Sequence, residues 1–388
     1  MELTSKQQEA LTIAVSRYLN HEPYTCISGY AGVGKTTLIS FIVDALGLAP
    51  YQVCYIAYTG KAALVLQEMG CENAMTAHRL LYVSKPRPDG TFFHIPRRPL
   101  PPYQLIVCDE ISMLPKDMWE LLLSHRIHVI ALGDPAQLPP ITEDNGILAH
   151  PHIFLDEIVR QAQDNEIIKL SMDIRMGLPL TPFHGKQVQV IHKSELVDGM
   201  YTWADQIICA KNDTRRDINS LMRQKLFEVS NPDPIEGDKV ICLRNNWEDA
   251  NELGDCMVNG TMGTVSYIRY DYNDQYLSPK LTWDFLPDGY TASTSAEDPY
   301  FRDISIDYKL LTTGEPTVTP SNFKKFPKTY VPKEFDYGYC ITCWKAQGSQ
   351  YNKVLLFEEN FPFDEEEHRR YLYTGITRAV EKLVVVKK

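Results

Sequence analysis

The segment GYAGVGKT at residues 29–36 constrains the fold of this chain more than any other stretch. It follows the β-branched run YTCISGY (24–30) and precedes TTLISFIVDALG (36–47), which has the apolar spacing of a helix. Between a strand and a helix, the spacing GxxxxGK[ST] lets backbone N–H groups close around phosphates at the helix N-terminus. The segment therefore predicts a parallel α/β domain that binds a nucleotide.

Residue types within this segment predict a division of roles. Lys35 can reach the β- and γ-phosphates, and the Thr36 hydroxyl can ligate Mg²⁺. The phosphates themselves are expected to lie against the loop and the start of the helix. The remaining candidates for that contact are Gly29, Gly32, Val33, Gly34 and Thr37.

An acidic pair in VCDEISM (107–113) supplies carboxylates for magnesium binding and for activation of water, which the phosphate loop lacks. Asp109, at a strand end, would hold the magnesium through water, and Glu110 would orient and deprotonate the attacking water. A solvated acidic pair would be the simpler interpretation if the phosphate loop were absent. With the loop present, the adjacent Asp and Glu indicate hydrolysis rather than transfer to another acceptor.

Three further residues are candidates for contacts around the γ-phosphate. Gln137, in ALGDPAQLPPI (131–141), follows a strand end within reach of the attacking water. Arg160 and Arg378 are candidates for arginines that a second domain presents to the developing charge. An arginine considered alone would more often form a surface ion pair. These two are candidates because they occur together with the phosphate loop, the acidic pair and Gln137.

The alternation of strand-like and helix-like stretches predicts an α/β fold with more than one domain, as expected for 388 residues. Residues 1–150 form the first parallel-sheet domain in this interpretation, with buried strands near 24–30, 52–58, 104–110 and 127–134. The proline-rich stretch 83–102 is expected to project from it as a hairpin. Residues 151–235 and 336–388 would form a second α/β domain, interrupted by a β-rich insertion at 236–335.

Composition narrows the class of protein without fixing its substrate. The hydrophobic content of 44% is that of a globular protein, and no apolar run approaches the roughly 20 residues that span a bilayer. The N-terminus lacks a signal-peptide layout, and nine scattered cysteines suit a reducing compartment, so a cytoplasmic protein without membrane contact is expected. Cys340 and Cys343 lack a second ligand pair for zinc. The net charge of −11 argues only mildly against nucleic acid.

Taken in order, the motifs resemble those of superfamily 1 helicases, and within them the 1B branch. The resemblance runs nearly end to end and rests on motif I (GYAGVGKTT), motif II (VCDEISML) and motif III (ALGDPAQLPPI). Further strings match in the same order: LTSKQQEAL (3–11), AYTGKAA (57–63), TAHRLL (76–81), LDEIVRQAQDNEIIKLS (155–171), GYCITCWKAQGSQY (338–351) and LYTGITRA (372–379).

The resemblance implies two RecA-like domains with ATP in the cleft between them and single-stranded DNA across their tops. It implies that Gln7 reads the adenine, that the hairpin is a strand-separation pin and that the insertion is an SH3-like domain. Movement along the strand would be 5′ to 3′, on single-stranded and forked DNA. The residues expected to contact DNA are Thr59, Lys61 and His78 in the first domain, Phe92 and Phe93 on the pin, and Thr342 and Trp344 in the second domain.

Two positions depart from the pattern of the family. Motif Ia usually has proline where this chain has Tyr58, and motif V usually has histidine where it has Trp344. Trp344 could stack on a base, worth roughly 1–3 kcal/mol, or could be a packing residue that abandons the contact with the strand. Both interpretations stay open from the sequence.

Other functions remain compatible with the sequence. A superfamily 1 motor on RNA would meet the same phosphates, and an ATP switch that toggles a protein partner needs only the nucleotide site. The second is disfavoured by Thr59-Gly60-Lys61 and the motif V string, which the nucleotide site does not require. A single-strand-binding protein or a replisome component is a possible partner, and the chain is expected to act as a monomer.

Overall fold

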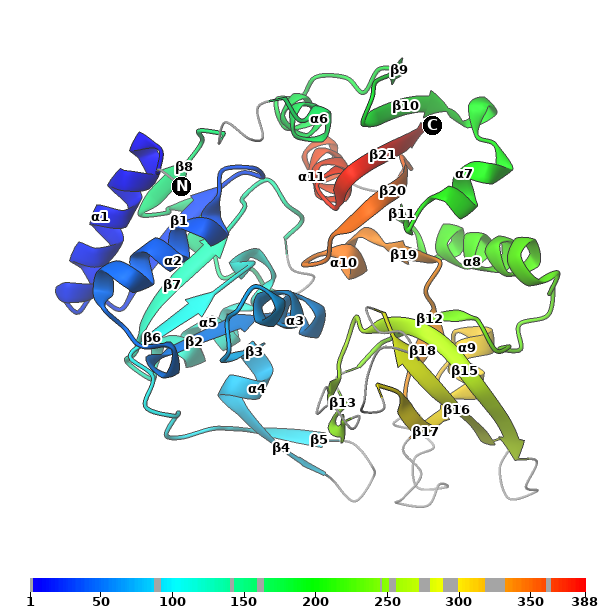
Figure 1. Ribbon diagram of the computed structural model, residues 1–388, viewed down its shortest axis with the longest axis horizontal. Coiled ribbons are helices and arrows are strands. Elements are labelled where there is room, and N and C mark those ends of the chain that lie inside the picture. The colour runs from blue at the N-terminus through cyan, green and yellow to red at the C-terminus, as the bar shows by residue number, and fades with distance from the viewer. Residues whose placement is uncertain are drawn as a thin grey trace.

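The computed structural model of this protein describes most of the chain. The described ranges are 3–86, 92–139, 143–158, 164–244, 246–250, 256–271, 280–288, 299–317, 332–360 and 364–388. They form two α/β units that face each other, with an antiparallel sheet beneath the second (Figure 1).

The first unit is built on a six-stranded parallel sheet of order β3-β2-β6-β7-β1-β8. Helices α1 and α2 cover one face, and α4 and α5 cover the other, each through a separate apolar core. The strands are β1 (Tyr24–Gly29), β2 (Val53–Ala57), β3 (Ala74–Thr76), β6 (Leu105–Cys108), β7 (His128–Gly133) and β8 (Ile153–Leu155). The helices are α1 (Ser5–Leu19), α2 (Lys35–Leu46), α3 (Gly60–Glu68), α4 (Ala77–Leu81) and α5 (Lys116–Leu123).

The four strands expected from the sequence are β1, β2, β6 and β7, and their positions confirm the prediction. Strands buried on both faces read as continuous apolar runs, and β6 and β7 are buried at every residue. The expected boundary at residue 150 lies before β8, which pairs in parallel with β1 from Ile27 to Gly29. The first sheet therefore continues past that boundary, because β1 would otherwise lack a neighbour on one side.

The second unit has a six-stranded sheet of order β19-β11-β20-β21-β10-β9. Its pairs are parallel except for the antiparallel pair of β9 and β10 at one edge. The strands are β9 (Phe183–His184), β10 (Val188–His192), β11 (Gln206–Cys209), β19 (Cys340–Thr342), β20 (Tyr351–Phe357) and β21 (Ala379–Lys387). The helices are α6 (Glu166–Arg175), α7 (Asp198–Trp203), α8 (Asn212–Phe227), α10 (Cys343–Ala346) and α11 (Glu365–Ile376).

The insertion between α8 and β19 contains a five-stranded antiparallel sheet of order β17-β16-β15-β12-β18. Its core, with Trp283, Phe285 and Phe335 fully buried, is continuous with the core on one face of the second sheet. The prediction of an inserted β-rich unit is confirmed, while its SH3-like class stays a prediction. Its strands are β12 (Lys239–Cys242), β15 (Met262–Asp271), β16 (Lys280–Pro287), β17 (Phe301–Ile306) and β18 (Phe335–Tyr337), beside a small pair of β13 (Asn246–Ala250) and β14 (Cys256–Met257), and α9 (Tyr308–Thr313) follows β17.

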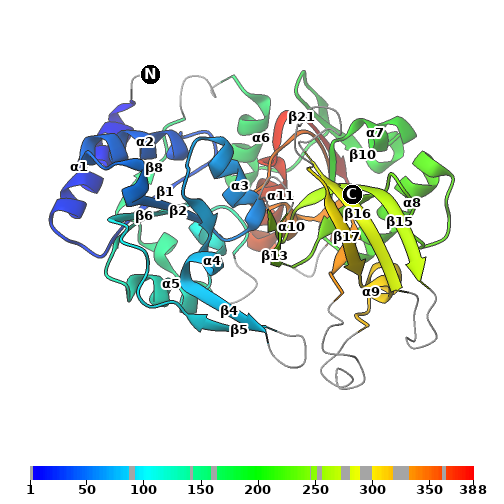
Figure 2. The ribbon, with the colours of Figure 1, turned by 60° about the horizontal axis from the view of Figure 1, so that its bottom comes forward.

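The expected hairpin is present as β4 (Tyr82–Pro86) and β5 (Phe92–Pro96), which pair antiparallel and project from the first unit (Figure 2). The turn at 87–91 and the side chains of Phe92 and Phe93 lie outside what the structure describes. The contact of those two side chains with a duplex therefore stays a prediction. No helix in the described part of the chain is long and apolar enough to span a bilayer.

Candidate nucleotide and nucleic-acid site

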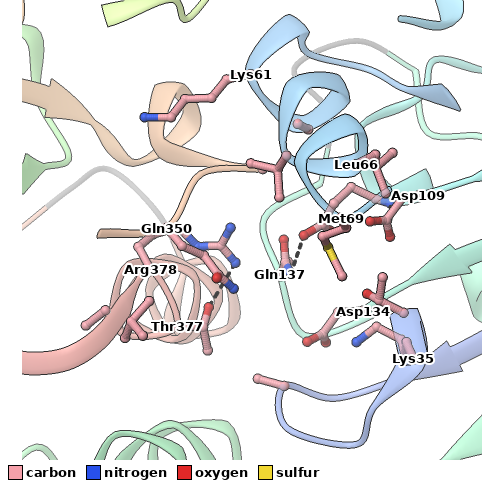
Figure 3. A pocket seen from close by; sticks show the side chains of 18 of the residues that line it. Lys35, Lys61, Leu66, Met69, Asp109, Asp134, Gln137, Gln350, Thr377 and Arg378 are labelled. Atoms are coloured by element: carbon pink, nitrogen blue, oxygen red, sulfur yellow. Dashed lines mark hydrogen bonds between the residues drawn. The ribbon is translucent and has the colours of Figure 1, made fainter. Parts of the chain in front are cut away.

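Most of the predicted nucleotide residues, from both α/β units, line one cavity of about 1140 Å³, whereas Gln7, Gly29 and Val33 are not among its lining residues. Lys35, Asp109 and Gln137 lie on the wall of the first unit, and Arg378 lies on the opposite wall (Figure 3). Other predicted residues at the cavity are Gly32, Gly34, Thr36, Thr37, Lys61 and Glu110. The cavity lies at the carboxyl ends of β1, β6 and β7, where parallel sheets place their ligands.

The phosphate loop depends on glycine at three positions. Gly32 and Gly34 have φ values of 79° and 74°, a region that side chains disfavour. A Cβ on Gly29 would lie 2.8 Å from the carbonyl oxygen of Leu155 in the neighbouring strand. The Lys35 ammonium donates to the carbonyl oxygens of Gly29 (2.7 Å) and Tyr30 (3.0 Å), so the loop is folded around its own lysine.

Gln7 lies against this loop rather than in open space. Its side chain is 5% exposed, and its Nε2 donates to the carbonyl oxygen of Val33 at 2.9 Å. Its Oε1 accepts from the backbone N–H of Thr4 at 3.0 Å, which completes a capping box at the start of α1. Gln7 therefore ties α1 to the phosphate loop, and contact with adenine stays a prediction.

The acidic pair lies directly beneath the loop. Burial, and then the charge of Glu110, raise the pKa of Asp109 to about 6, although the N–H of Glu110 and the charge of Lys35 act in the opposite direction. Glu110 has a φ of 51°, and its N–H donates to Asp109 Oδ1 at 2.9 Å. This turn points two adjacent carboxylates at the same cavity.

Gln137 connects the acidic pair to motif III. Its Nε2 donates to Glu110 Oε1 at 3.4 Å. Its Oε1 is buried and has no hydrogen-bond partner among the described residues. Buried polar atoms are rarely left unpaired, so this amide fits a polar ligand such as phosphate or water in the cavity.

Asp134, three residues before Gln137, was missed by the sequence analysis although it stands in the same quoted string. It is 1% exposed and accepts from the N–H of Ala136 (3.0 Å) and the hydroxyl of Tyr373 (2.6 Å). Burial raises the pKa of Asp134, against the lowering effect of the Lys35 charge and of the Tyr373 hydroxyl. Its position directly after a buried strand was the signal that could have identified it.

Arg378 lies on the cavity wall opposite Lys35, and its contact with a phosphate stays a prediction. It is 4% exposed, and its guanidinium donates to the Thr374 carbonyl (3.1 Å), the Ser349 carbonyl (3.3 Å) and the Thr377 hydroxyl (3.1 Å). These contacts hold it within the second unit at the edge of the cavity. Arg160 lies outside the described residues.

Apart from Phe92 and Phe93 on the hairpin, the residues predicted to contact DNA lie in or at the start of short helices of both units. Thr59 caps α3, where its Oγ1 accepts from the N–H of Ala62. Lys61 lies with its ammonium 4.6 Å from the ring centroid of Tyr351, so it already reaches the second unit. Thr342 occupies the N-cap position of α10.

The two positions that depart from the family pattern are both packed against protein. Trp344 is half-buried against the core of the second unit, which favours packing over a fully free stacking surface. Tyr58 packs against a core of the first unit, and its ring centroid lies 5.6 Å from that of His78. His78, in α4, therefore lies beside Tyr58, the residue that replaces the usual proline of motif Ia.

Comparison with known families agrees with this arrangement. A family model described as "AAA domain" matches residues 2–197, half of the chain, and one described as "UvrD-like helicase C-terminal domain" matches residues 337–386. The chain is 22% identical to the ATP-dependent DNA helicase dda of Enterobacteria phage T4, over 97% of both chains. It is 27% identical to the ATP-dependent RecD2 DNA helicase of Deinococcus radiodurans, over 92% of this chain and 46% of that protein.

Solved structures show the same fold. The Pif1 helicase from Bacteroides in complex with ADP-AlF3 and ssDNA superposes with a TM-score of 0.55 at 17% identity, over 99% of this chain and 92% of that one. The phosphate loop, the acidic pair, motif III and the arginine after α11 meet in one cavity, as the order of the motifs predicts. With the matching family models and relatives, these observations show that the chain belongs to the superfamily 1B helicases.

Proposed function

We propose that this protein is an ATP-dependent DNA helicase that moves along single-stranded DNA 5′ to 3′ and separates the duplex ahead of it. One observation carries the proposal: the phosphate loop and acidic pair of one unit share a cavity with Arg378 of the other. A nucleotide there touches both units, so its binding and hydrolysis change how the two units are held together. The relatives named as DNA helicases support DNA as the track.

Different residues of the cavity have different roles in the hydrolysis of ATP. Lys35 and the loop N–H groups hold the phosphates, and Glu110 takes the proton of the attacking water, with Gln137 orienting both. Thr36 and Asp109 line the same cavity and are oxygen donors of the kind Mg²⁺ prefers, so they fit that ion. Bound there, Mg²⁺ would neutralise phosphate charge.

Closure of the cleft follows from the position of Arg378 on the wall opposite the phosphate loop. Arg378 gains phosphate contacts when a nucleotide lies against the first unit, and hydrolysis followed by release removes them. Arg160 is proposed for the same role. Each cycle then closes and opens the gap between α3, which carries Thr59 and Lys61, and α10, which begins after Thr342.

The DNA path is proposed from the positions of those helices. Alternate grip by the two sides converts closure into a step along the strand, and the β4–β5 hairpin stands where a duplex would be parted. Stacking in DNA holds about 1.4 kcal/mol per step. An aromatic side chain at the hairpin, Phe92 or Phe93, could offset much of one step. A single copy of the chain contains all these parts.

The test follows ATP hydrolysis and strand separation together on forked DNA with only a 5′ or only a 3′ single-stranded tail. An RNA-tailed fork is the comparison. Hydrolysis stimulated by DNA, with unwinding only from the 5′ tail, is the expected result. Unwinding only from the 3′ tail would overturn the polarity, and a preference for the RNA tail would overturn the substrate. Hydrolysis indifferent to every strand would overturn the helicase function and favour a switch that acts on a protein partner.

A further inference from the structure

A tyrosine of the second unit binds the phosphate loop directly. The hydroxyl of Tyr373, on α11, accepts from the backbone N–H of Ala31 at 2.9 Å and donates to Asp134 Oδ2 at 2.6 Å. Ala31 lies in the phosphate loop, and Asp134 follows β7 of the same unit. One hydroxyl therefore joins three segments that the sequence separates widely.

Burial makes this link strong. Tyr373 is 2% exposed and Asp134 is 1% exposed, so water does not compete for either bond. Burial and the nearby carboxylate of Asp134 raise the pKa of Tyr373, so the hydroxyl keeps the proton that it donates. A donor bound to a carboxylate forms a stronger hydrogen bond than a neutral pair does.

The same stretch of chain carries Arg378 and a second contact with the first unit. Thr374 Oγ1 accepts from the buried N–H of Leu138, the residue after Gln137 in motif III, at 3.0 Å. The carbonyl oxygen of Thr374 in turn accepts from Arg378 Nε at 3.1 Å. A shift of α11 away from the loop would therefore move Arg378 with it.

Helix α6 makes a second contact with the phosphate loop, at Tyr30, the residue before Ala31. The guanidinium carbon of Arg175 lies 3.5 Å from the ring centroid of Tyr30. Helices α6 and α11 lie side by side at the cleft (Figure 1). The second unit thus touches two consecutive residues of the phosphate loop, 30 and 31, by separate side chains.

We propose that Tyr373 is a positioning residue that couples the phosphate loop to α11 and thereby sets where Arg378 stands in the cleft. The inference rests on the proposed function, because it assigns Tyr373 a part in the same hydrolytic cycle. Tyr373 is not among the residues that line the cavity, so we expect its ring to make no contact with a nucleotide bound there. Loss of the hydroxyl should therefore reduce kcat more than it changes the KM for ATP.

The test compares Tyr373→Phe with Tyr371→Phe. Tyr371 lies two residues away on the same helix and is fully buried, but its hydroxyl donates to the Phe357 carbonyl within its own unit. For Tyr373→Phe, kcat at saturating DNA should fall about tenfold, equivalent to about 1.4 kcal/mol, with KM within about twofold. Tyr371→Phe should lower thermal stability about as much as Tyr373→Phe does, but it should leave kcat and the KM for ATP within twofold of the wild type.

A second variant and a second measurement complete the test. Thr374→Val, which removes the acceptor for the Leu138 N–H, should lower kcat in the same direction as Tyr373→Phe. Small-angle scattering of the nucleotide-free protein should show a larger radius of gyration for Tyr373→Phe than for the wild type and for Tyr371→Phe.

Equal kcat for Tyr373→Phe and the wild type, or equal losses in the two tyrosine variants, would overturn the inference. A wild type whose hydrolysis ignores DNA would instead overturn the proposed function, and the DNA-free kcat would then test Tyr373. If the wild type hydrolyses no ATP, the scattering comparison decides, and an unchanged radius for Tyr373→Phe overturns the inference.

Discussion

At the scale of the residue, Lys35 illustrates how the site is prepared for an anion. Its ammonium is held by two carbonyl oxygens of its own loop, at 2.7 and 3.0 Å. These are weak partners for a full charge compared with phosphate oxygens, so binding of a nucleotide replaces them with better ones. The lysine is half-buried at the cavity wall, where charge interactions are stronger than in water.

Lys35→Ala should therefore abolish most hydrolysis. Removal of a preorganised donor from an active site costs on the order of 10²–10³ in kcat, and we expect a loss at least of that size. Steady-state hydrolysis of ATP with saturating single-stranded DNA measures it. The matched control is Lys6→Ala, which removes an exposed lysine of α1 whose ammonium lies 3.7 Å from the Glu9 carboxylate. A Lys35→Ala protein with more than a tenth of wild-type kcat would contradict the assignment of this loop.

At the scale of the element, a buried ion pair fixes the insertion to α8. Arg223 and Asp238 are 3% and 0% exposed, and Nε lies 2.9 Å from Oδ1. Arg223 also donates to the Asn231 carbonyl at 2.7 Å, while Asp238 accepts from the Ile235 N–H and the Tyr339 hydroxyl. Each charge is thus paired and hydrogen-bonded, the condition under which a buried pair is tolerated.

Breaking that pair from one side should be costly. Arg223→Met leaves the Asp238 carboxylate buried and uncompensated, and such losses destabilise by about 3–5 kcal/mol. Urea titration of the free energy of unfolding measures the change. Arg216→Met on the same helix is the control, because its pair with Asp213 is exposed and is worth about 0–1 kcal/mol. Similar losses in the two variants would refute the special role of the buried pair.

Elements differ in how far their sequence predicts them. The strands near 24, 52, 104 and 127 were predictable because both faces are buried and each ends at, or directly before, a polar residue or a glycine. Strand β8 has three residues, too few for periodicity to appear, and its place is set by pairing with β1. The order of the antiparallel strands in the insertion likewise depends on long-range pairs that local patterns do not encode.

The residues of the site also differ in how far the local sequence predicts them. Lys35 and Thr36 were predictable because the spacing of the loop places them at the start of α2, and Asp109 and Glu110 because they directly follow β6. The bond from Ala31 to Tyr373 spans 342 positions in the chain, and no local spacing signals it. Asp134 could have been found from its place after β7, whereas its hydroxyl partner could not.

At the scale of the whole molecule, the first unit also meets the insertion and the motif V loop around the start of α3, at one side of the nucleotide cavity. Gly60, between Thr59 and Lys61 at the start of α3, packs so closely on the insertion that a Cβ would lie 1.9 Å from Val258 Cγ2. Gly348, after α10, would bring a Cβ within 2.9 Å of the Ala62 Cβ. The proposed strand contacts on α3 therefore lie at a junction where glycine permits close approach.

Gly60→Ala should disturb this junction and weaken the hold on DNA. The added methyl must displace α3 or the insertion, and either shift moves Thr59 and Lys61 relative to α10. We expect the Kd for single-stranded DNA to rise about tenfold, a change of about 1.4 kcal/mol, while the Kd for a fluorescent ATP analogue stays within twofold. Gly199→Ala in α7 is the control, since its Cβ would meet nothing within 4 Å. Unchanged DNA affinity in Gly60→Ala would show that the start of α3 is not part of the strand path, whereas a matching loss in Gly199→Ala would attribute the effect to general destabilisation.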